Sequence, residues 1–178
     1  MRVLVCGGAG YIGSNMTALL TKEGYSPVVL DNLSKGHRGA IRNVQLVVGD
    51  FGDTNFILET LQKYRIEAVM HFAAFIEVGE SVTQPLRYYD NNVSKTRTLL
   101  EAMEKTCVMK FVFSSSAAVY GMPEVIPITE EVAKHPINPY GETKWTVERM
   151  CHFQSQTGKL RYAALRYFNA SGAGFGAT

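Results

Sequence analysis

The feature that most constrains the fold is the glycine-rich run GGAGYIG at residues 7–13, which separates an apolar stretch from an amphipathic one. The apolar run before it has the length of a buried strand, and the pattern from residue 11 to about residue 23 predicts a helix. Three spaced glycines allow a tight turn and a close approach of the backbone, while the N–H groups of a helix N-terminus attract an anion. This order of elements predicts a site for a pyrophosphate.

Asp31 is an acidic residue at the distance from the glycine turn at which dinucleotide-binding sites have one. The second apolar run, residues 27–30, ends at Asp31, and an acidic residue about twenty positions beyond the glycine turn meets the ribose hydroxyls of an adenosine. The alternative is that Asp31 is a solvated turn residue. Lys35, His37 and Arg38 suggest a site for a 2′-phosphate, but Asp31 would repel that group. We therefore expect a dinucleotide in this region, and NAD rather than NADP.

Strand-length apolar runs alternate with helical patterns along the chain, which predicts βαβ units and a parallel sheet covered on both faces. The 178 residues allow one domain that buries roughly 70% of its unfolded surface. We expect a Rossmann-type, doubly wound α/β fold over residues 1–178, with strands near 3–6, 28–30, 45–48, 68–72, 111–115 and 162–167, and helices near 11–23, 54–64, 86–105 and 139–157.

Composition excludes several classes of protein. A net charge of +2, with 19% charged residues, provides no basic stripe for nucleic acid. Cys6, Cys107 and Cys151 are odd in number and widely spaced, so we expect neither a disulfide framework nor a metal site. The first strand begins close to Met1 and no apolar run reaches membrane-spanning length, so we expect a cytoplasmic protein without a leader or a membrane span.

Tyr140 and Lys144 are four residues apart on a predicted helix, so their side chains point from the same face. An ammonium about 4 Å from a phenol, at an effective dielectric constant of about 20, favours the phenolate by roughly 4 kcal/mol, or about three pK units. We expect this charge to bring the pKa of Tyr140 towards neutrality, where general acid–base catalysis is efficient. The alternative is an exposed surface pair.

Hydroxyl side chains end the strand predicted before this helix. Residues 114–116 are three serines at its carboxyl end, the edge where parallel sheets bind ligands. We expect Ser114 and Ser115 to be hydrogen-bonding groups of the strand end rather than catalysts. The proline-rich stretch 122–139 is a long loop after the same strand, and we expect it to wall a substrate cleft.

At this point the chain resembles the extended short-chain dehydrogenase/reductase family and, within it, the UDP-glucose (UDP-galactose) 4-epimerases. The resemblance covers essentially the whole sequence. Its motifs are GGAGYIG at 7–13, DNLSKG at 31–36, GD at 49–50, HFAA at 71–74, VGESV at 78–82, YYDNNV at 88–93, SSSAAVYG at 114–121, PYGETK at 139–144 and LRYFN at 165–169.

The resemblance implies a role for each matching residue. Tyr140 would be the acid–base, Lys144 would tune it and bind the nicotinamide ribose, and Ser116 would bridge to the sugar. Ser116, Tyr140 and Asn169 would bind the substrate, and Asn169 would contact the diphosphate of a nucleotide sugar. The remaining NAD-binding positions would be Gly7, Gly10, Tyr11, Ile12, Gly13, Asp31, Asn32, Asp50, Phe51, Phe72, Ala73, Ala74, Asn91, Ser114 and Tyr167.

Several of these positions have a structural alternative. Asp50 and Asn92 could be capping groups. Either Asn91 or Asn92 would organise the neighbouring backbone in the family pattern. His71 ends a predicted buried strand, and we expect it to be a structural histidine without a part in proton transfer.

The residues after the serines separate related reactions. Family dehydratases place acidic residues there, because elimination of water needs an added acid and base, whereas this chain has Ala117 and Ala118. We therefore expect NAD-dependent C4 epimerisation of a UDP-hexose, UDP-galactose to UDP-glucose, through a transient 4-keto sugar. The alternatives are a cofactor-binding module without turnover, or another nucleotide-sugar enzyme such as a decarboxylase or a uronic acid C4-epimerase.

Family members continue into a second domain that supplies most contacts to the uridine diphosphate, and this chain ends at Thr178 in a glycine-rich segment. We expect that the substrate domain is missing and that activity belongs to a longer protein. The family also pairs two long helices across a dimer interface. By this analogy we expect a homodimer through helices 86–105 and 139–157, with no nucleic acid or membrane partner.

Overall fold

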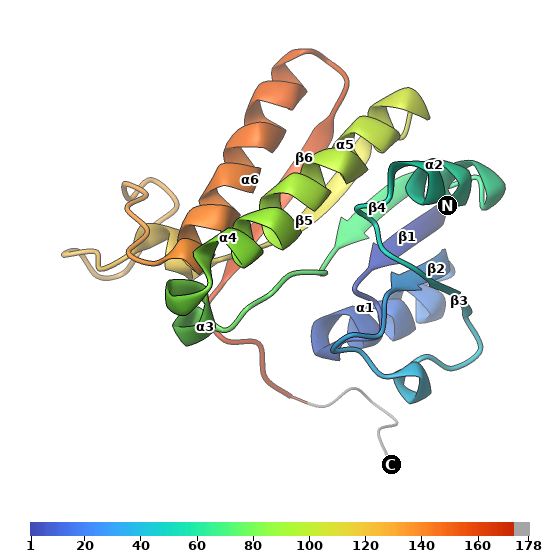
Figure 1. Cartoon of the computed structure of the whole chain (residues 1–178), viewed down its shortest axis with the longest axis horizontal. Helices are drawn as coiled ribbons and strands as arrows, with labels where there is room; N and C mark the ends of the chain where they lie inside the picture. Colours follow the sequence, from blue (N-terminus) through green and yellow to red (C-terminus); the bar gives the residue numbers. More distant parts are fainter. Residues whose placement is uncertain (173–178) are drawn as a thin grey trace.

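The strand-length apolar runs form one parallel sheet. The computed structural model describes residues 1–172, and within them the sheet has six strands in the order β3-β2-β1-β4-β5-β6. Figure 1 shows the sheet with its helices, coloured along the chain. This order is that of a doubly wound dinucleotide-binding sheet, so the predicted fold class is confirmed. The strands are β1 Arg2–Cys6, β2 Ser26–Asp31, β3 Gln45–Val48, β4 Ala68–His71, β5 Lys110–Ser116 and β6 Arg161–Tyr167.

The strand order reverses between β1 and β4. Strand β1 pairs with β2 on one side and with β4 on the other, so the connections on the two sides of β1 lead away from each other. A crevice forms at the carboxyl ends of the strands at such a point, and it is where open α/β sheets bind ligands. The topology therefore places the glycine turn, which follows β1, at the expected ligand crevice.

The predicted helices near residues 11, 54 and 139 form with nearly the expected bounds. Helix α2 begins after Asp53, whose carboxylate accepts the N–H groups of Asn55 and Phe56. Helix α6 begins after Asn138, with Pro139 in its first turn, a common arrangement at a helix start. The helices are α1 Tyr11–Lys22, α2 Thr54–Lys63, α3 Val78–Thr83, α4 Pro85–Tyr88, α5 Lys95–Lys105 and α6 Pro139–Gln156.

The predicted single helix 86–105 is divided. Helix α4 passes into a π-helical segment, Tyr89–Ser94, and only then into α5. The wider π turn directs the side chains of Asn91 and Asn92 inward, and both are buried. Helix α3 and the 3-10 turn Ala117–Tyr120 were not expected. The predicted loop is confirmed, because residues 122–138 contain no helix or strand.

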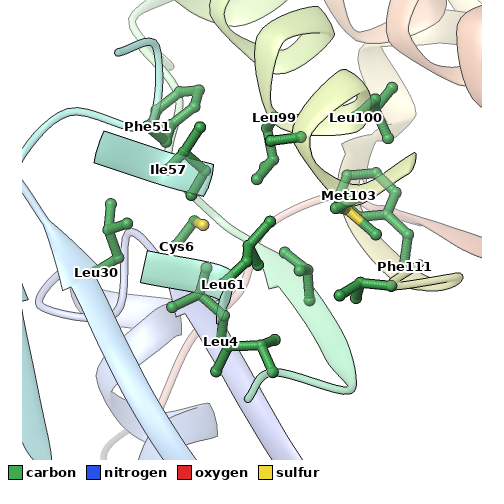
Figure 2. Close-up of a cluster of buried hydrophobic side chains, with 14 of the residues drawn as sticks. Leu4, Cys6, Leu30, Phe51, Ile57, Leu61, Leu99, Leu100, Met103 and Phe111 are labelled. Carbon is green, nitrogen blue, oxygen red and sulfur yellow. The ribbon is translucent and has the colours of Figure 1, made fainter. Parts of the chain in front are cut away.

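The main core lies between the sheet and the helices α2, α5 and α6. Alternate residues of β1 separate the two faces: Leu4 and Cys6 join this core, whereas Val3 and Val5 pack with Leu20 of α1 on the other face. Figure 2 shows Ile57 and Leu61 of α2 and Leu99 of α5 meeting over the sheet. Strand β1 is therefore buried on both faces, below the carboxyl ends of the strands. In residues 1–172, no helix combines the length and the apolarity needed to cross a bilayer.

Candidate functional site

A cleft opens at the carboxyl ends of β1, β4, β5 and β6. Its larger part, the main cleft, has a volume of about 790 Å³ and is lined by residues from Gly7 to Ala170. A smaller inner pocket of about 110 Å³ lies over β2 and β3. The two share the lining residues Gly7, Gly10, Lys35, Phe72, Ala74 and Phe75. Together they form one elongated site of the size that small-molecule ligands occupy.

The glycine turn is packed too tightly for side chains. Gly7 has a φ of 74°, and a Cβ at this position would lie 2.5 Å from the backbone nitrogen of Ala73. A Cβ on Gly13 would lie 2.2 Å from the carbonyl oxygen of Gly7. Helix α1 has Gly10 as its N-cap without a side-chain hydrogen bond, and its first turn contains no acidic residue. The N-terminus of α1 therefore remains open to an anion.

Asp31 faces the inner pocket from the end of β2. The residue is 7% exposed, and its carboxylate accepts the N–H of Ala9 at 2.9 Å and that of Leu33 at 2.8 Å. The alternative of a solvated turn residue is therefore wrong, because Asp31 ties the glycine turn to the loop after β2. Buried carboxylates in this position disfavour a second anion nearby.

Ser116, Tyr140 and Lys144 come together in the main cleft. The Ser116 side chain accepts the N–H of Ala118 at 3.2 Å, which directs the end of β5 into the 3-10 turn. The ammonium of Lys144 is buried, donates to the carbonyl oxygen of Ser114 at 2.8 Å, and lies 5.8 Å from the centre of the Tyr140 ring. The alternative of an exposed Tyr140–Lys144 pair is therefore wrong.

The expected direction of the Tyr140 pKa is also wrong for the chain by itself. Burial raises the pKa of Tyr140 above its ordinary value of 10.0, while hydrogen bonding from Ser116 acts in the opposite direction. Burial also lowers the pKa of Lys144 to about 7, so this lysine is only partly charged near neutral pH. Desolvation of Tyr140 and Lys144 therefore outweighs the attraction between a phenolate and an ammonium at these positions.

Tyr167, at the end of β6, lines the main cleft together with Ser116, Tyr140 and Lys144. Its hydroxyl is buried and lacks a well-aligned hydrogen-bond partner within residues 1–172, although the Ser114 side chain lies close enough to favour the phenolate. Burial raises the pKa of Tyr167, and the phenol raises that of Tyr140 in turn. Tyr167 lines the main cleft, and a buried donor without a partner is a group that a polar ligand can satisfy.

The two asparagines of the π segment have different surroundings. Asn92 accepts the N–H of Phe75 at 2.9 Å and donates to its carbonyl oxygen at 3.0 Å, so it holds the segment after β4 by both backbone groups. It also donates to Thr143 of α6 at 3.2 Å. Asn91 donates to Asn92 and lines the inner pocket. Of the two candidates, Asn92 is the one that organises the backbone.

Most residues named from the sequence line the cleft, and one does not. Asp50 bonds to the N–H of Gly52 and forms an ion pair with Lys95 at 2.6 Å, and it does not line either part of the site. His71 is buried among aromatic rings, bonds to Thr96 at 3.0 Å and has a pKa lowered by burial to about 3, as a structural histidine would. The predicted residues that line the cleft are Gly7, Gly10, Tyr11, Ile12, Gly13, Asp31, Asn32, Phe51, Phe72, Ala73, Ala74, Asn91, Ser114, Ser116, Tyr140, Lys144, Tyr167 and Asn169.

Several residues of the cleft wall are not among those named from the sequence. Ile128 comes from the loop before α6, and Phe168 follows β6. Helix α3 and the segment before it contribute Ile76, Glu77, Val78 and Glu80. Phe168 lies inside the quoted motif LRYFN, Val78 and Glu80 lie inside VGESV, and Ile128 lies in the loop that was expected to wall a cleft. Ile76 and Glu77 had no such signal, because they only precede a helix too short for periodicity to reveal.

The site fits a dinucleotide. The glycine turn and the open N-terminus of α1 suit a pyrophosphate, and the inner pocket with Asp31 suits an adenosine. At the other end, a phenol, a buried ammonium and two serine hydroxyls surround the space where a nicotinamide and a reacting hydroxyl would lie. Such an arrangement can move one proton to or from a ligand beside a bound redox cofactor.

Comparisons with known proteins agree with this geometry. Residues 3–178 match the model of the NAD dependent epimerase/dehydratase family. The UDP-glucose 4-epimerase of Lactobacillus helveticus is 50% identical over 174 residues, which are 97% of this chain and 53% of that protein. The crystal structure of UDP-glucose 4-epimerase from Brucella ovis in complex with NAD is 52% identical and superposes with a TM-score of 0.95, over 97% of this chain and 53% of its own.

A more distant structure has the same fold. The UDP-glucose 4-epimerase of Thermotoga maritima, solved with UDP-glucose, is 36% identical with a TM-score of 0.90, over 94% of this chain and 55% of its own. The chain therefore spans about half the length of the curated relatives and solved structures that it matches.

Proposed function

The chain belongs to the NAD dependent epimerase/dehydratase family, and we propose that it forms the NAD-binding and catalytic part of an enzyme that epimerises a UDP-hexose at C4. The observation that carries the proposal is the meeting of Ser116, Tyr140 and Lys144 at one end of a dinucleotide-shaped cleft. Ala117 and Ala118, which line the same cleft, provide no acid or base for a dehydration.

In the proposed reaction, NAD held by the glycine turn and Asp31 would supply the acceptor for the hydride of C4, and the hydride would return to the opposite face of C4 after the keto sugar turns over in the site. Tyr140 takes the proton of the C4 hydroxyl on its phenolic oxygen and returns it to the same oxygen, so that protons and electrons balance over a cycle. Ser116 bridges the phenol and that hydroxyl. Lys144, fixed by the carbonyl oxygen of Ser114, binds the nicotinamide ribose and stabilises the phenolate.

We propose that the remaining lining residues hold the cofactor and substrate. The glycine turn would bind the pyrophosphate and Asp31 the adenosine ribose, with Phe51 and Asn91 beside the adenine. Tyr167 would use its unpaired hydroxyl at the nicotinamide end, and Asn169 would contact the substrate diphosphate. Asp50 would contribute through the segment Gly49–Phe51, since its carboxylate is engaged by Lys95.

The uridine diphosphate needs a second surface. Because the matched relatives are about twice as long, we propose that residues outside this chain supply it and that the functional enzyme is the longer protein. The competing function is a module that holds NAD without turnover. It is favoured by the openness of the main cleft towards Ile76 and Phe168, which are 61% and 67% exposed.

The test is conversion of UDP-galactose to UDP-glucose by the 178-residue chain and by a Tyr140→Phe variant, with bound NAD quantified in both samples. Turnover that the variant lacks, with NAD binding retained, supports a catalytic site that is complete in this chain. NAD binding without turnover in the wild type supports the module, or a requirement for the longer protein. Absence of NAD binding contradicts the proposal.

We further propose a homodimer through α4–α5 and α6. These helices run side by side in Figure 1, and they or their flanks expose the apolar residues Val82, Leu86 and Phe153. Sedimentation of the chain as a monomer at micromolar concentration would contradict this proposal.

We also propose that the protein works in a reducing compartment, the cytoplasm. The free thiols of Cys6, Cys107 and Cys151 support this proposal.

A further inference from the structure

An ion pair joins two of the segments that carry the proposed catalytic residues: Glu148 is buried, and the Arg166 side chain is 19% exposed. Glu148 of α6 is 4% exposed, and its carboxylate accepts the Nε of Arg166 at 2.9 Å and 3.0 Å on its two oxygens and also accepts Nη2. The same carboxylate accepts the hydroxyl of Ser115. Arg166 in turn donates from Nη1 to the hydroxyl of Tyr120 at 2.8 Å. Neither Glu148 nor Arg166 lines the cleft.

We propose that Glu148 and Arg166 are positioning residues, which hold the Ser116 hydroxyl in place at the phenol of Tyr140. The inference rests on the proposed function, because it assigns a purpose to the contact between Ser116 and Tyr140.

The placement of Ser116 is the first support. Ser115 and Arg166 are partners in the register of β5 and β6, so both side chains meet Glu148 from the same face of the sheet. The pair therefore holds the residue just before Ser116. Through Tyr120 it also holds the end of the 3-10 turn just after Ser116. Ser116 is thus fixed on both sides along the chain.

The second support is that Tyr140, Lys144 and Tyr167 lie on the same two elements as the ion pair. Lys144 precedes Glu148 by one helical turn on α6, and Tyr140 precedes it by two turns. Tyr167 is the next residue after Arg166 on β6. One carboxylate and one guanidinium therefore connect the segments that carry Ser116, Tyr140, Lys144 and Tyr167.

The chemistry of the pair favours positioning over stabilisation. Burying two charges costs much of what their attraction returns, and apolar residues of the same volume often stabilise a core as well. A guanidinium fork on a carboxylate, in contrast, permits one narrow arrangement of the two side chains. The pair therefore defines the relative position of α6, β5 and β6 more sharply than apolar packing would.

Ionisation of Tyr140 provides a measurement that needs no turnover. Three groups face the phenol: Ser116 lowers its pKa, Tyr167 raises it, and the Lys144 ammonium lies 5.8 Å from its ring centre. If Glu148→Gln releases Ser116, the pKa of Tyr140 should rise. A direct effect of charge has the opposite sign, because removal of a nearby carboxylate lowers the pKa of a phenol.

The experiment is a pH titration of the 178-residue chain labelled with ¹³Cζ-tyrosine, in which the Tyr140 signal is identified by its loss in Tyr140→Phe. In Glu148→Gln the phenolate fraction of Tyr140 at pH 10 should fall about tenfold to hundredfold, as expected for loss of one hydrogen bond to a charged group. Ser116→Ala should cause the same fall, and the double variant should show no further change.

Two further variants keep the test decisive. Glu104→Gln removes a carboxylate that pairs with Lys159 away from the cleft, and it should leave the titration unchanged. Ser115→Ala keeps the ion pair and removes only its bond to β5, so it should shift the titration in the same direction if Glu148→Gln does not fold.

An unchanged or lowered pKa in Glu148→Gln, or a fall in the double variant that adds to that of Ser116→Ala, would overturn the proposal. If Glu148→Gln does not fold, an unchanged titration in Ser115→Ala would overturn it instead. A coupled titration in a chain that neither binds NAD nor turns over a UDP-sugar would leave the positioning intact and reject only the proposed function.

Discussion

At the scale of single residues, burial sets the protonation states in and around the cleft. It lowers the pKa of Lys144 to about 7 and that of His71 to about 3, and it raises the pKa of Tyr140. In each case burial favours the uncharged form. A cofactor that brings positive charge to the phenol would therefore act on a group that is neutral beforehand.

Lys144 should make the stability of the cofactor-free chain depend on pH. Its pKa is about 7 in the folded chain against an ordinary value of 10.5, so the unfolded chain binds more protons between these pH values and stability rises with pH. Lys144→Met lacks this effect. We expect the variant to be more stable than the wild type at pH 7, and its advantage to shrink by about 2 kcal/mol by pH 9.

Urea unfolding of both proteins at pH 7, 8 and 9 measures this difference. The comparison cancels contributions from other groups, such as Cys6 and Cys151, whose pKa values burial raises. Parallel stability profiles would show that Lys144 titrates in its ordinary range.

At the scale of elements, the π segment between α4 and α5 is what connects the helices to the cleft. An α-helix through residues 86–105 would present Asn91 and Asn92 differently. The π turn buries both, and Asn92 then reaches the backbone of Phe75 and the side chain of Thr143. Such π turns occur often at functional sites, and here Phe75 lines both parts of the cleft.

Loss of the Asn92 side chain should therefore destabilise the chain. Asn92→Ala leaves the N–H and the carbonyl oxygen of Phe75 without their partner, and we expect the free energy of unfolding to fall by about 2–3 kcal/mol. Asn15→Ala is the matched control, because Asn15 is exposed on α1 and makes one bond, to the carbonyl oxygen of Tyr11. It should change stability by less than about 0.5 kcal/mol.

Urea unfolding measures both variants. Equal effects of the two substitutions would mean that water replaces the bonds of Asn92 at no cost. The affinity for NAD should fall in Asn92→Ala alone, since only this variant frees a segment of the cleft wall.

At the scale of the whole molecule, the sheet and three helices form a rigid support for a cleft at one end. The face of β6 opposite α6 is less well covered, with Ala163 and Leu165 exposed. Packing is close around the glycine turn of the cleft. A ligand that binds only this folded cleft should raise the stability of the whole chain.

NAD should stabilise the chain against heat. At a concentration about 100 times its dissociation constant, a ligand adds about 2.7 kcal/mol, which in a chain of this size raises the unfolding midpoint by roughly 5–10 °C. Gly13→Ala should abolish the shift, because its Cβ would lie 2.2 Å from the carbonyl oxygen of Gly7. Gly79→Ala should retain it, since nothing lies within 4 Å of its Cβ.

Scanning calorimetry with and without NAD measures both shifts. An equal shift in Gly13→Ala and in Gly79→Ala would place the cofactor away from the glycine turn.

The amino-acid sequence by itself determined the fold class, the six strands and the placement of Tyr140 and Lys144 on one helix face. These follow from local patterns, namely apolar runs of strand length and a helical spacing of four, whereas the role of Ser116 was implied by the family resemblance. The structure decided the roles of Asp31, Asn92 and Asp50. Asp31 is buried and bonded to Ala9, Asn92 rather than Asn91 holds the backbone of Phe75, and Asp50 pairs with Lys95. Each of these roles depends on a partner far away in the chain.

Only the tertiary structure decided the protonation of the site residues and the contacts that hold them in place. The pKa of Tyr140 moves opposite to the expectation because desolvation depends on every element packed around the phenol. Glu148 and Arg166 look like ordinary charged residues in the sequence. They become an ion pair, with Glu148 buried, because the register of β5 and β6 and the packing of α6 bring them together. Local spacing determines which residues share an element, whereas burial and long-range pairing determine what those residues do.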